Sequence, residues 1–169
     1  MMMKYLIVGI LLLLGGCAAS EASFAEADRA TPFRVIAPEE LPGEWKLNEF
    51  IEEESLVIAE FSLESRGHLE LIQDPYIQGL DDDLLRRYLT GAEQLYPSAL
   101  PENEDIMRID DFVGVWSMLD TETTQFTFVR LNDLYEYTPK QMPRYQIIGS
   151  DIEEEEIKHF IKQLGTISS

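Results

Sequence analysis

Residues 110–137, DDFVGVWSMLDTETTQFTFVRLNDLYEY, contain two apolar segments joined by a short polar turn. In Phe112–Leu119 the apolar residues fall on both alternating faces, which is typical of a strand that is covered on both sides. In Gln125–Leu131 apolar and polar residues alternate, with Phe126 and Phe128 on the same face, which indicates a second strand. Because only Asp120–Thr124 separates the two segments, we expect them to pair in antiparallel fashion.

The same kind of pattern predicts further strands on both sides of this pair. Upstream, Ser55–Leu63 alternates, and Ser65–Gly67 is a hairpin connection that returns the chain into His68–Ile72. Downstream, Asn132-Asp133 predicts a tight turn that leads into a returning strand. Trp45–Phe50 fits either a strand or a turn. Phe33–Ile36 is a short apolar stretch that precedes a proline-rich segment. The remaining short strands are expected at Ile106–Ile109, Leu134–Tyr137 and Tyr145–Ile148.

Two segments show the periodicity of amphipathic helices. Asp81–Tyr96 begins with a residue suited to N-capping. Asp151–Leu164 begins with the spacing of a capping box at Asp151 and Glu154, and Gly165 follows it where a C-terminal cap belongs. Strands and helices in this order, joined by short turns, predict an α+β fold in which a mainly antiparallel sheet packs against two amphipathic helices.

The first 17 residues have the layout of an export signal. Lys4 supplies a positive charge, Tyr5–Leu14 is an apolar run, and Leu14-Gly15-Gly16-Cys17 is a small-residue cleavage site that ends at the only cysteine. The apolar run is too short to span a membrane, which takes about 20 residues. This stretch resembles the lipobox of bacterial lipoproteins. The resemblance implies cleavage between Gly16 and Cys17, with acyl chains such as palmitate anchoring Cys17 in the membrane.

These features predict three parts of the chain: a signal peptide over 1–16, a lipidated cysteine and flexible tether over 17–31, and a single domain over 32–169. Alanine, serine and glutamate dominate the tether, which is typical of a linker. The resemblance to lipoproteins also implies a location in the cell envelope, outside the cytoplasm. Because Ala18 rather than Asp follows the cysteine, we expect the outer membrane in a host with two membranes. In a host with one membrane we expect the outer face of the plasma membrane.

The chain is strongly acidic, with a net charge of −19 at pH 7. Nucleic acid and anionic lipid headgroups repel such a surface, so we exclude a nucleic-acid partner and expect the membrane link to run through the lipid on Cys17. The charge is compatible with binding of cationic partners or divalent cations, and also with a role in solubility alone. The sequence contains no phosphate loop, dinucleotide fingerprint or zinc spacing, so we expect no cofactor and no metal. A calcium site at Asp110 and Asp111 is the remaining alternative.

Three motifs make the domain similar to the PsbP/DcrB-like family. They are Phe33–Pro38 followed by Trp45, the glycine-containing strand Asp111–Trp116, and the hairpin Phe126–Tyr137 followed by a terminal amphipathic helix. That family has an antiparallel sheet flanked by helices and occurs in photosystem lumenal subunits and bacterial envelope lipoproteins. Tyr145–Gly149 with its following helix looks instead like an uncharacterised terminal domain of Gram-positive and archaeal envelope proteins. Both resemblances imply a non-enzymatic accessory or binding domain.

Aromatic residues are concentrated in the predicted sheet, where we expect most of them to pack in the core. Four are candidates for an exposed ligand or partner patch: Trp45, Tyr135, Tyr137 and Tyr145. Prolines in the loop before Tyr145 prevent regular strand pairing there, which favours exposure of the neighbouring tyrosines.

No catalytic set emerges from the spacing of the residues. The two histidines, His68 and His159, lie on expected polar faces, and the chain has no Gly-x-Ser-x-Gly elbow. We therefore expect a non-enzymatic envelope protein that binds an unidentified envelope protein partner. Two alternatives stay open: a carrier or sensor that holds a hydrophobic or small ligand in an apolar cavity, and a hydrolase whose site the sequence does not reveal.

Overall fold

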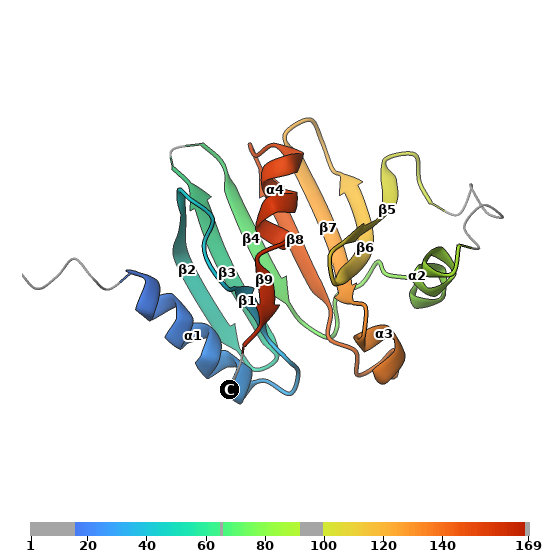
Figure 1. Ribbon diagram of the computed structural model, residues 1–169, viewed down its shortest axis with the longest axis horizontal. Helices are drawn as coiled ribbons and strands as arrows, with labels where there is room; N and C mark the ends of the chain where they lie inside the picture. Colours follow the sequence, from blue (N-terminus) through green and yellow to red (C-terminus); the bar gives the residue numbers. More distant parts are fainter. Residues whose placement is uncertain (1–15, 65, 92–99, 168–169) are drawn as a thin grey trace, which may run out of the picture.

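The computed structural model describes residues 16–64, 66–91 and 100–167, with side chains from residue 21 onward. A seven-stranded sheet runs through the centre of the molecule in the order β2-β3-β4-β8-β7-β6-β5, and a two-stranded sheet pairs β1 with β9 (Figure 1). Every pairing is antiparallel, which confirms the expected α+β fold with a mainly antiparallel sheet. The strands are β1 (Ile36–Pro38), β2 (Trp45–Glu53), β3 (Leu56–Leu63), β4 (His68–Gln73), β5 (Glu104–Ile109), β6 (Phe112–Met118), β7 (Thr123–Arg130), β8 (Tyr145–Ser150) and β9 (Leu164–Thr166).

Helices cover the two faces of the sheet unequally (Figure 1). One face, here called the front face, packs against α4, β1, β9 and α1. The opposite back face packs against α2 and α3 at its β5–β7 end, and no described helix lies over its β2–β4 end. The helices are α1 (Gly16–Ala30), α2 (Asp82–Leu89), α3 (Asp133–Glu136) and α4 (Glu154–Ile161).

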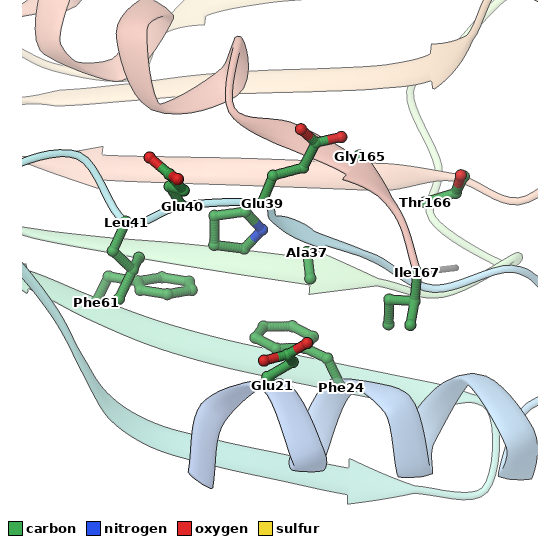
Figure 2. Close-up of a pocket in the computed structure, with 11 residues that line it drawn as sticks. Glu21, Phe24, Ala37, Glu39, Glu40, Leu41, Phe61, Gly165, Thr166 and Ile167 are labelled. Carbon is green, nitrogen blue, oxygen red and sulfur yellow. The ribbon is translucent and has the colours of Figure 1, made fainter. Parts of the chain in front are cut away.

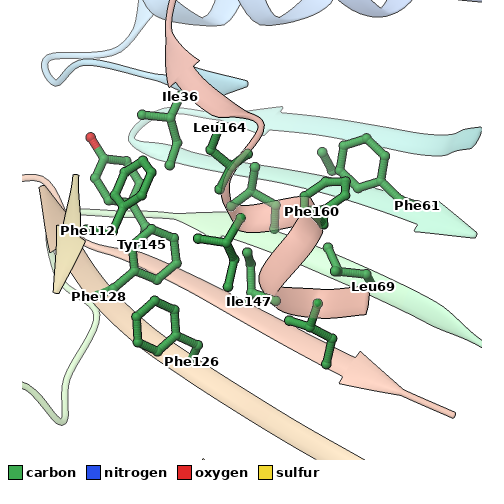
Figure 3. Close-up of a cluster of buried hydrophobic side chains, with 14 of the residues drawn as sticks. Ile36, Phe61, Leu69, Phe112, Phe126, Phe128, Tyr145, Ile147, Phe160 and Leu164 are labelled. Atoms are coloured by element: carbon green, nitrogen blue, oxygen red, sulfur yellow. The ribbon is translucent and has the colours of Figure 1, made fainter. Parts of the chain in front are cut away.

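The main core lies between the sheet and the elements on its front face (Figure 3). Alternate residues of β3 and β4 are buried there, because a strand turns successive side chains to opposite faces. Phe160 of α4 packs against Trp45 and Phe61, with ring centroids 5.1 and 4.9 Å away. Further rings continue this core across the sheet: Phe112, Trp116, Phe126, Phe128 and Tyr145.

β6 is covered on both faces, as its sequence predicts. On the front face, Gly114 lies against the backbone of β7, where a side-chain carbon would collide with the Thr127 carbonyl oxygen and the Phe128 Cα. This close approach of two strands requires glycine. The back face of β6 contributes to a second core, which consists of Leu85, Ile106, Val113, Val129, Leu134 and Met142.

The predicted helix over 81–96 and the predicted strand over 134–137 have different outcomes. Asp81 caps α2 as expected, since its Oδ1 accepts hydrogen bonds from two main-chain N–H groups at 3.0 Å each. α2 ends at Leu89, with Thr90 as its C-terminal cap, so it stops before the predicted end. Residues 92–96 lie outside the described residues. The prediction of a returning strand over Leu134–Tyr137 is wrong, because Asp133–Glu136 forms the helix α3. One helical turn buries Leu134 in the second core and leaves Tyr135 in solvent.

α4 is shorter than the predicted helix over 151–164. It begins after Glu153, whose N–H donates to the Glu156 carboxylate at 3.2 Å, so the capping residues lie two positions later than predicted. The chain leaves the helix at Lys162 and continues into β9. Gly165 lies in that strand, so its predicted role as a helix cap is wrong.

The segment expected to be a flexible tether, 17–31, differs most from its prediction. All but its last residue belongs to α1, which packs on the β2 side of the front face. Phe24 is 3% exposed, and its ring centroid lies 4.9 Å from that of Phe50. Asp28 accepts a hydrogen bond from the Val35 N–H at 2.8 Å, which fixes the end of the helix to the following chain. Phe24 is the single large apolar residue of the segment, and one such residue creates no periodicity.

Two buried polar side chains attach the β1 region to the main sheet. Gln73 of β4 is fully buried, accepts a hydrogen bond from the Ile36 N–H at 2.8 Å and donates one to the Ile36 carbonyl at 2.9 Å. The Tyr145 hydroxyl donates to the Arg34 carbonyl at 2.8 Å. Gln73 thus acts toward Ile36 as a neighbouring strand would, and satisfies both of its backbone groups.

Candidate functional site

A surface pocket of about 650 Å³ lies beside α1, between that helix and β1, β3 and β9 (Figure 2). This volume is in the range of small-molecule sites. We call it the α1/β9 pocket. It is lined by Glu21, Phe24, Ala37, Pro38, Glu39, Glu40, Leu41, Phe61, Gly165, Thr166 and Ile167.

The floor of the α1/β9 pocket is apolar. Phe61 from β3 is fully buried and Phe24 from α1 nearly so, while Leu41 and Ile167 are half-buried at its sides. Covering such a surface with apolar atoms of a ligand is favourable by about 25 cal/mol per Å². The floor therefore suits an aliphatic or aromatic group.

The rim of the pocket is acidic. Glu21, Glu39 and Glu40 are all exposed around it. No lysine, arginine or histidine is among the lining residues, and the ion pairs found within the described residues use other carboxylates. A concave site with one sign of charge raises the local concentration of ions of the opposite sign. The rim therefore favours a cationic group.

The pairing of β1 with β9 builds one wall of the pocket. Ala37 lies opposite Gly165, and the Glu39 N–H donates to the Gln163 carbonyl at 2.8 Å. The Glu39 side chain lies over Gly165 (Figure 2), where an added Cβ would come within 2.5 Å of the Glu39 Oε1. The absence of a side chain at position 165 thus leaves room for one of the three rim carboxyl groups.

The four aromatic residues predicted to form an exposed patch are not brought together. Trp45 is 6% exposed in the main core, and Tyr145 is fully buried. Burial raises the pKa of the Tyr145 phenol well above its ordinary value. Tyr135 and Tyr137 are 65% and 40% exposed at α3. The inclusion of Trp45 and Tyr145 in a surface patch is therefore wrong, because their rings fill the space between the sheet and its front layer.

The histidines and the aspartate pair lie in ordinary surface positions. His68 and His159 are both exposed. Asp110 and Asp111 form the turn between β5 and β6, in which Asp110 has a φ of +50° and its carbonyl accepts a hydrogen bond from Arg108 Nε at 3.1 Å. Among the residues with described side chains, no three His, Cys, Asp or Glu residues lie together in a way that would hold a metal ion. Within the described ranges, none of the helices has the length and apolar character needed to cross a membrane.

Two buried carboxylates support α2 and α3, away from the pocket. Asp82 lies 3.3 Å from Arg144 Nη2, and Asp133 lies 4.0 Å from Arg130 Nη1. Burial raises the pKa of Asp82 and of Asp133, and the neighbouring guanidinium groups oppose this rise. Arg144 also donates to the Ile77 carbonyl at 3.2 Å, so it joins the start of α2 to the preceding loop.

Sequence reasoning missed the α1/β9 pocket, because its residues come from segments with no shared motif. The sequence pattern places Glu21 and Phe24 in the predicted tether and Phe61 in a predicted strand. Two local signals were present: an isolated Phe24 among small residues, and the acidic pair Glu39-Glu40 between two prolines.

Comparison with known proteins identifies no relative: no family model matches the chain, and neither a curated protein nor a solved structure matches it. The function of the protein therefore has to be inferred from its own residues.

Proposed function

We propose that this protein is a lipid-anchored envelope protein whose domain binds, without catalysis, an amphiphilic molecule with an apolar body and a cationic head. The observation that carries the proposal is the α1/β9 pocket, where an apolar floor adjoins three carboxyl groups. Its lining residues include one hydroxyl group, that of Thr166, and no thiol or imidazole. The Thr166 hydroxyl therefore has no imidazole in the pocket to activate it as a nucleophile, which favours the holding of a ligand.

The lining of the α1/β9 pocket is expected to favour some classes of amphiphile over others. Phe24, Phe61 and Ile167 offer apolar contacts to a chain or ring, whatever the head group is. Glu39 and Glu40 attract an ammonium or guanidinium head, and they repel a carboxylate or sulfate head because like charges across an interface are unfavourable. The ligand is therefore expected to be a cationic amphiphile rather than a fatty acid.

The expected acylation site lies close to the pocket along α1. Glu21 and Phe24 follow Cys17 by four and seven residues, which corresponds to about 6 and 10 Å along a helix. A lipid on Cys17 would thus hold the pocket next to the membrane surface, where amphiphiles collect. In a host with two membranes this surface is that of the outer membrane, and otherwise it is the outer face of the plasma membrane.

Titration calorimetry of the mature chain, Cys17–Ser169, tests the pocket. We expect dodecyltrimethylammonium, below its micelle concentration, to bind at least about tenfold more tightly than dodecyl sulfate, with dodecyl maltoside in between. Replacing Glu39→Gln and Glu40→Gln together should weaken binding of the ammonium compound by about 3- to 10-fold, since each exposed ion pair contributes a modest free energy.

The matched control is Glu52→Gln with Glu53→Gln, an exposed acidic pair that does not line the pocket. The control should leave binding unchanged. Equal affinity for the ammonium and sulfate compounds, or equal weakening by the two double substitutions, would contradict the proposed ligand class.

The anchor is tested separately by fractionation and mass measurement of the wild type beside Cys17→Ser in the native host. We expect the wild type in the membrane fraction with the added mass of a diacylglyceryl group, and the variant without that mass. A soluble, unmodified wild type would overturn the anchor and the envelope location, but not the ligand specificity of the pocket.

A further inference from the structure

We propose that the β2–β4 end of the back face is a docking surface for a basic amphipathic helix of a partner protein. This surface lies on the side of the sheet opposite the α1/β9 pocket, and its residues are distinct from those of the pocket. The inference rests on two rows of side chains that the strand register places side by side.

The first row is acidic. Glu49 of β2 pairs directly with Glu60 of β3, and Glu60 pairs directly with Glu70 of β4. Directly opposite residues have Cβ atoms about 5 Å apart, and like charges in such positions destabilise a sheet. We call these three residues the acidic row.

The acidic row has no ion-pair partner among the residues that the structure describes, since the ion pairs found there use other carboxylates. Lys46 and His68 occupy the next row along the strands, where both face Ser62 rather than a glutamate. The isolated chain therefore carries an unfavourable charge arrangement that a cationic partner would relieve.

The second row is aliphatic. Two positions further along the strands, Ile51 pairs with Ile58 and Ile58 pairs with Ile72. Ile51 is 37% exposed, and the other two are half-buried with no described helix over them. We call these residues the isoleucine row. Together they form a contiguous, partly exposed aliphatic strip directly beside the acidic row, and contiguous apolar surface with a polar border is typical of contact sites.

The dimensions of the two rows fit one helix. Two residues along a strand advance by about 7 Å, and three neighbouring strands span about 10 Å. An α-helix with its side chains is about 10–12 Å in diameter. A helix laid across the strands would place apolar residues on the isoleucine row and lysine or arginine on the acidic row. Such pairing of an apolar face with a complementary surface is a recurrent mode of peptide recognition.

The negative charge of this surface also disfavours other occupants of the proposed docking site. Anionic lipid headgroups and nucleic acid are repelled by the acidic row. A second copy of this chain also carries a net charge of −19, so electrostatic repulsion opposes its approach. A basic protein segment is the occupant that both rows favour.

Calorimetry with the mature chain and a synthetic 18-residue amphipathic helix of leucine and lysine tests the surface. We expect the triple substitution Glu49→Gln, Glu60→Gln and Glu70→Gln to weaken binding at least tenfold. Substitution of Glu102, Glu122 and Glu136 by glutamine removes the same charge from exposed sites elsewhere and should change binding by less than twofold. The counterpart peptide of leucine and glutamate should not bind.

Two further measurements exclude trivial explanations. The acidic-row variant should unfold at a urea concentration no lower than that of the wild type, because the substitution removes repulsion. Amide chemical-shift changes caused by the peptide should lie in β2, β3 and β4. Equal weakening by the two triple substitutions, or shift changes confined to the α1/β9 pocket or to α2, would overturn the proposal. A dimer of the mature chain that the acidic-row substitution dissociates would also overturn it, in favour of a second copy.

Discussion

At the scale of single residues, Gln73 joins the two sheets of the protein. Its side-chain amide satisfies both backbone groups of Ile36, in a position with no access to solvent. We expect Gln73→Leu to lower the free energy of unfolding by about 2–4 kcal/mol, since it leaves two buried polar groups unpaired. Urea unfolding measures this loss. The control Gln125→Leu removes a half-buried amide that bonds to Thr127, and a comparable loss there would contradict the role of Gln73.

Two aspartates should give opposite dependences of stability on pH. Burial raises the pKa of Asp133 above its unfolded value, and Arg130 opposes this rise. Its contribution to stability is therefore complete below the unfolded pKa, near 3.8, and is lost as the pH rises through the folded pKa. From this group the wild type should gain stability as the pH falls from 7 toward 4. Asp133→Asn should remove that gain in urea unfolding at pH 7, 6, 5 and 4.

Asp120 provides the contrast. Main-chain N–H groups of Glu122 and Thr123 donate to its carboxylate at 2.8 Å each and lower its pKa. Its contribution is present above the unfolded pKa and is lost as the pH falls through the folded pKa. Asp120→Asn should thus destabilise the protein at pH 7, and the difference from the wild type should shrink below about pH 4. If the stability differences of the two variants from the wild type changed with pH in the same direction, both assigned pKa shifts would be contradicted.

At the scale of elements, α1 is a structural part of the domain and not a spacer. Phe24 packs edge to face against Phe50 and closes the floor of the pocket. We expect Phe24→Ala to lower the free energy of unfolding by about 3 kcal/mol, because it opens a cavity in the core. The control Glu26→Ala, on the exposed side of α1, should leave stability unchanged or slightly higher. Equal stability of the wild type and Phe24→Ala in thermal or urea unfolding would mean that α1 does not pack on the sheet in solution.

The elements differ in how far their sequences predict them. The sequences of β3, β4 and β7 alternate and that of β6 is apolar on both faces, and each strand is six residues or longer, so these patterns are visible in the sequence. α3 and β9 are too short for any period to be visible, and each depends on a contact distant in sequence. The sequence of Trp45–Phe50 is compatible with both a strand and a turn. Its antiparallel pairing with β3 shows that it forms a strand.

At the scale of the whole molecule, the class of fold is predictable from the sequence, whereas the strand order and the candidate site are not. Sheet order depends on which edges meet, and β8 inserts between β4 and β7 although it follows both in the chain. The patch prediction failed because alternation shows that Tyr145 faces one side of a strand, but not that α4 and β1 cover that side. The α1/β9 pocket exists only where segments from both ends of the domain meet.

This origin of the pocket affects when it can form. Ile36 of β1 pairs with Thr166 of β9, so one wall is built from residues that are synthesised at opposite ends of the domain. Contacts between such distant positions carry a high loop-closure entropy and tend to form late in folding. A chain that is still emerging from the ribosome or a translocation channel lacks β9 and therefore has no complete pocket. Capture of the proposed ligand would thus be tied to completion of the polypeptide, and an unfinished or truncated copy would not compete with the finished protein for it.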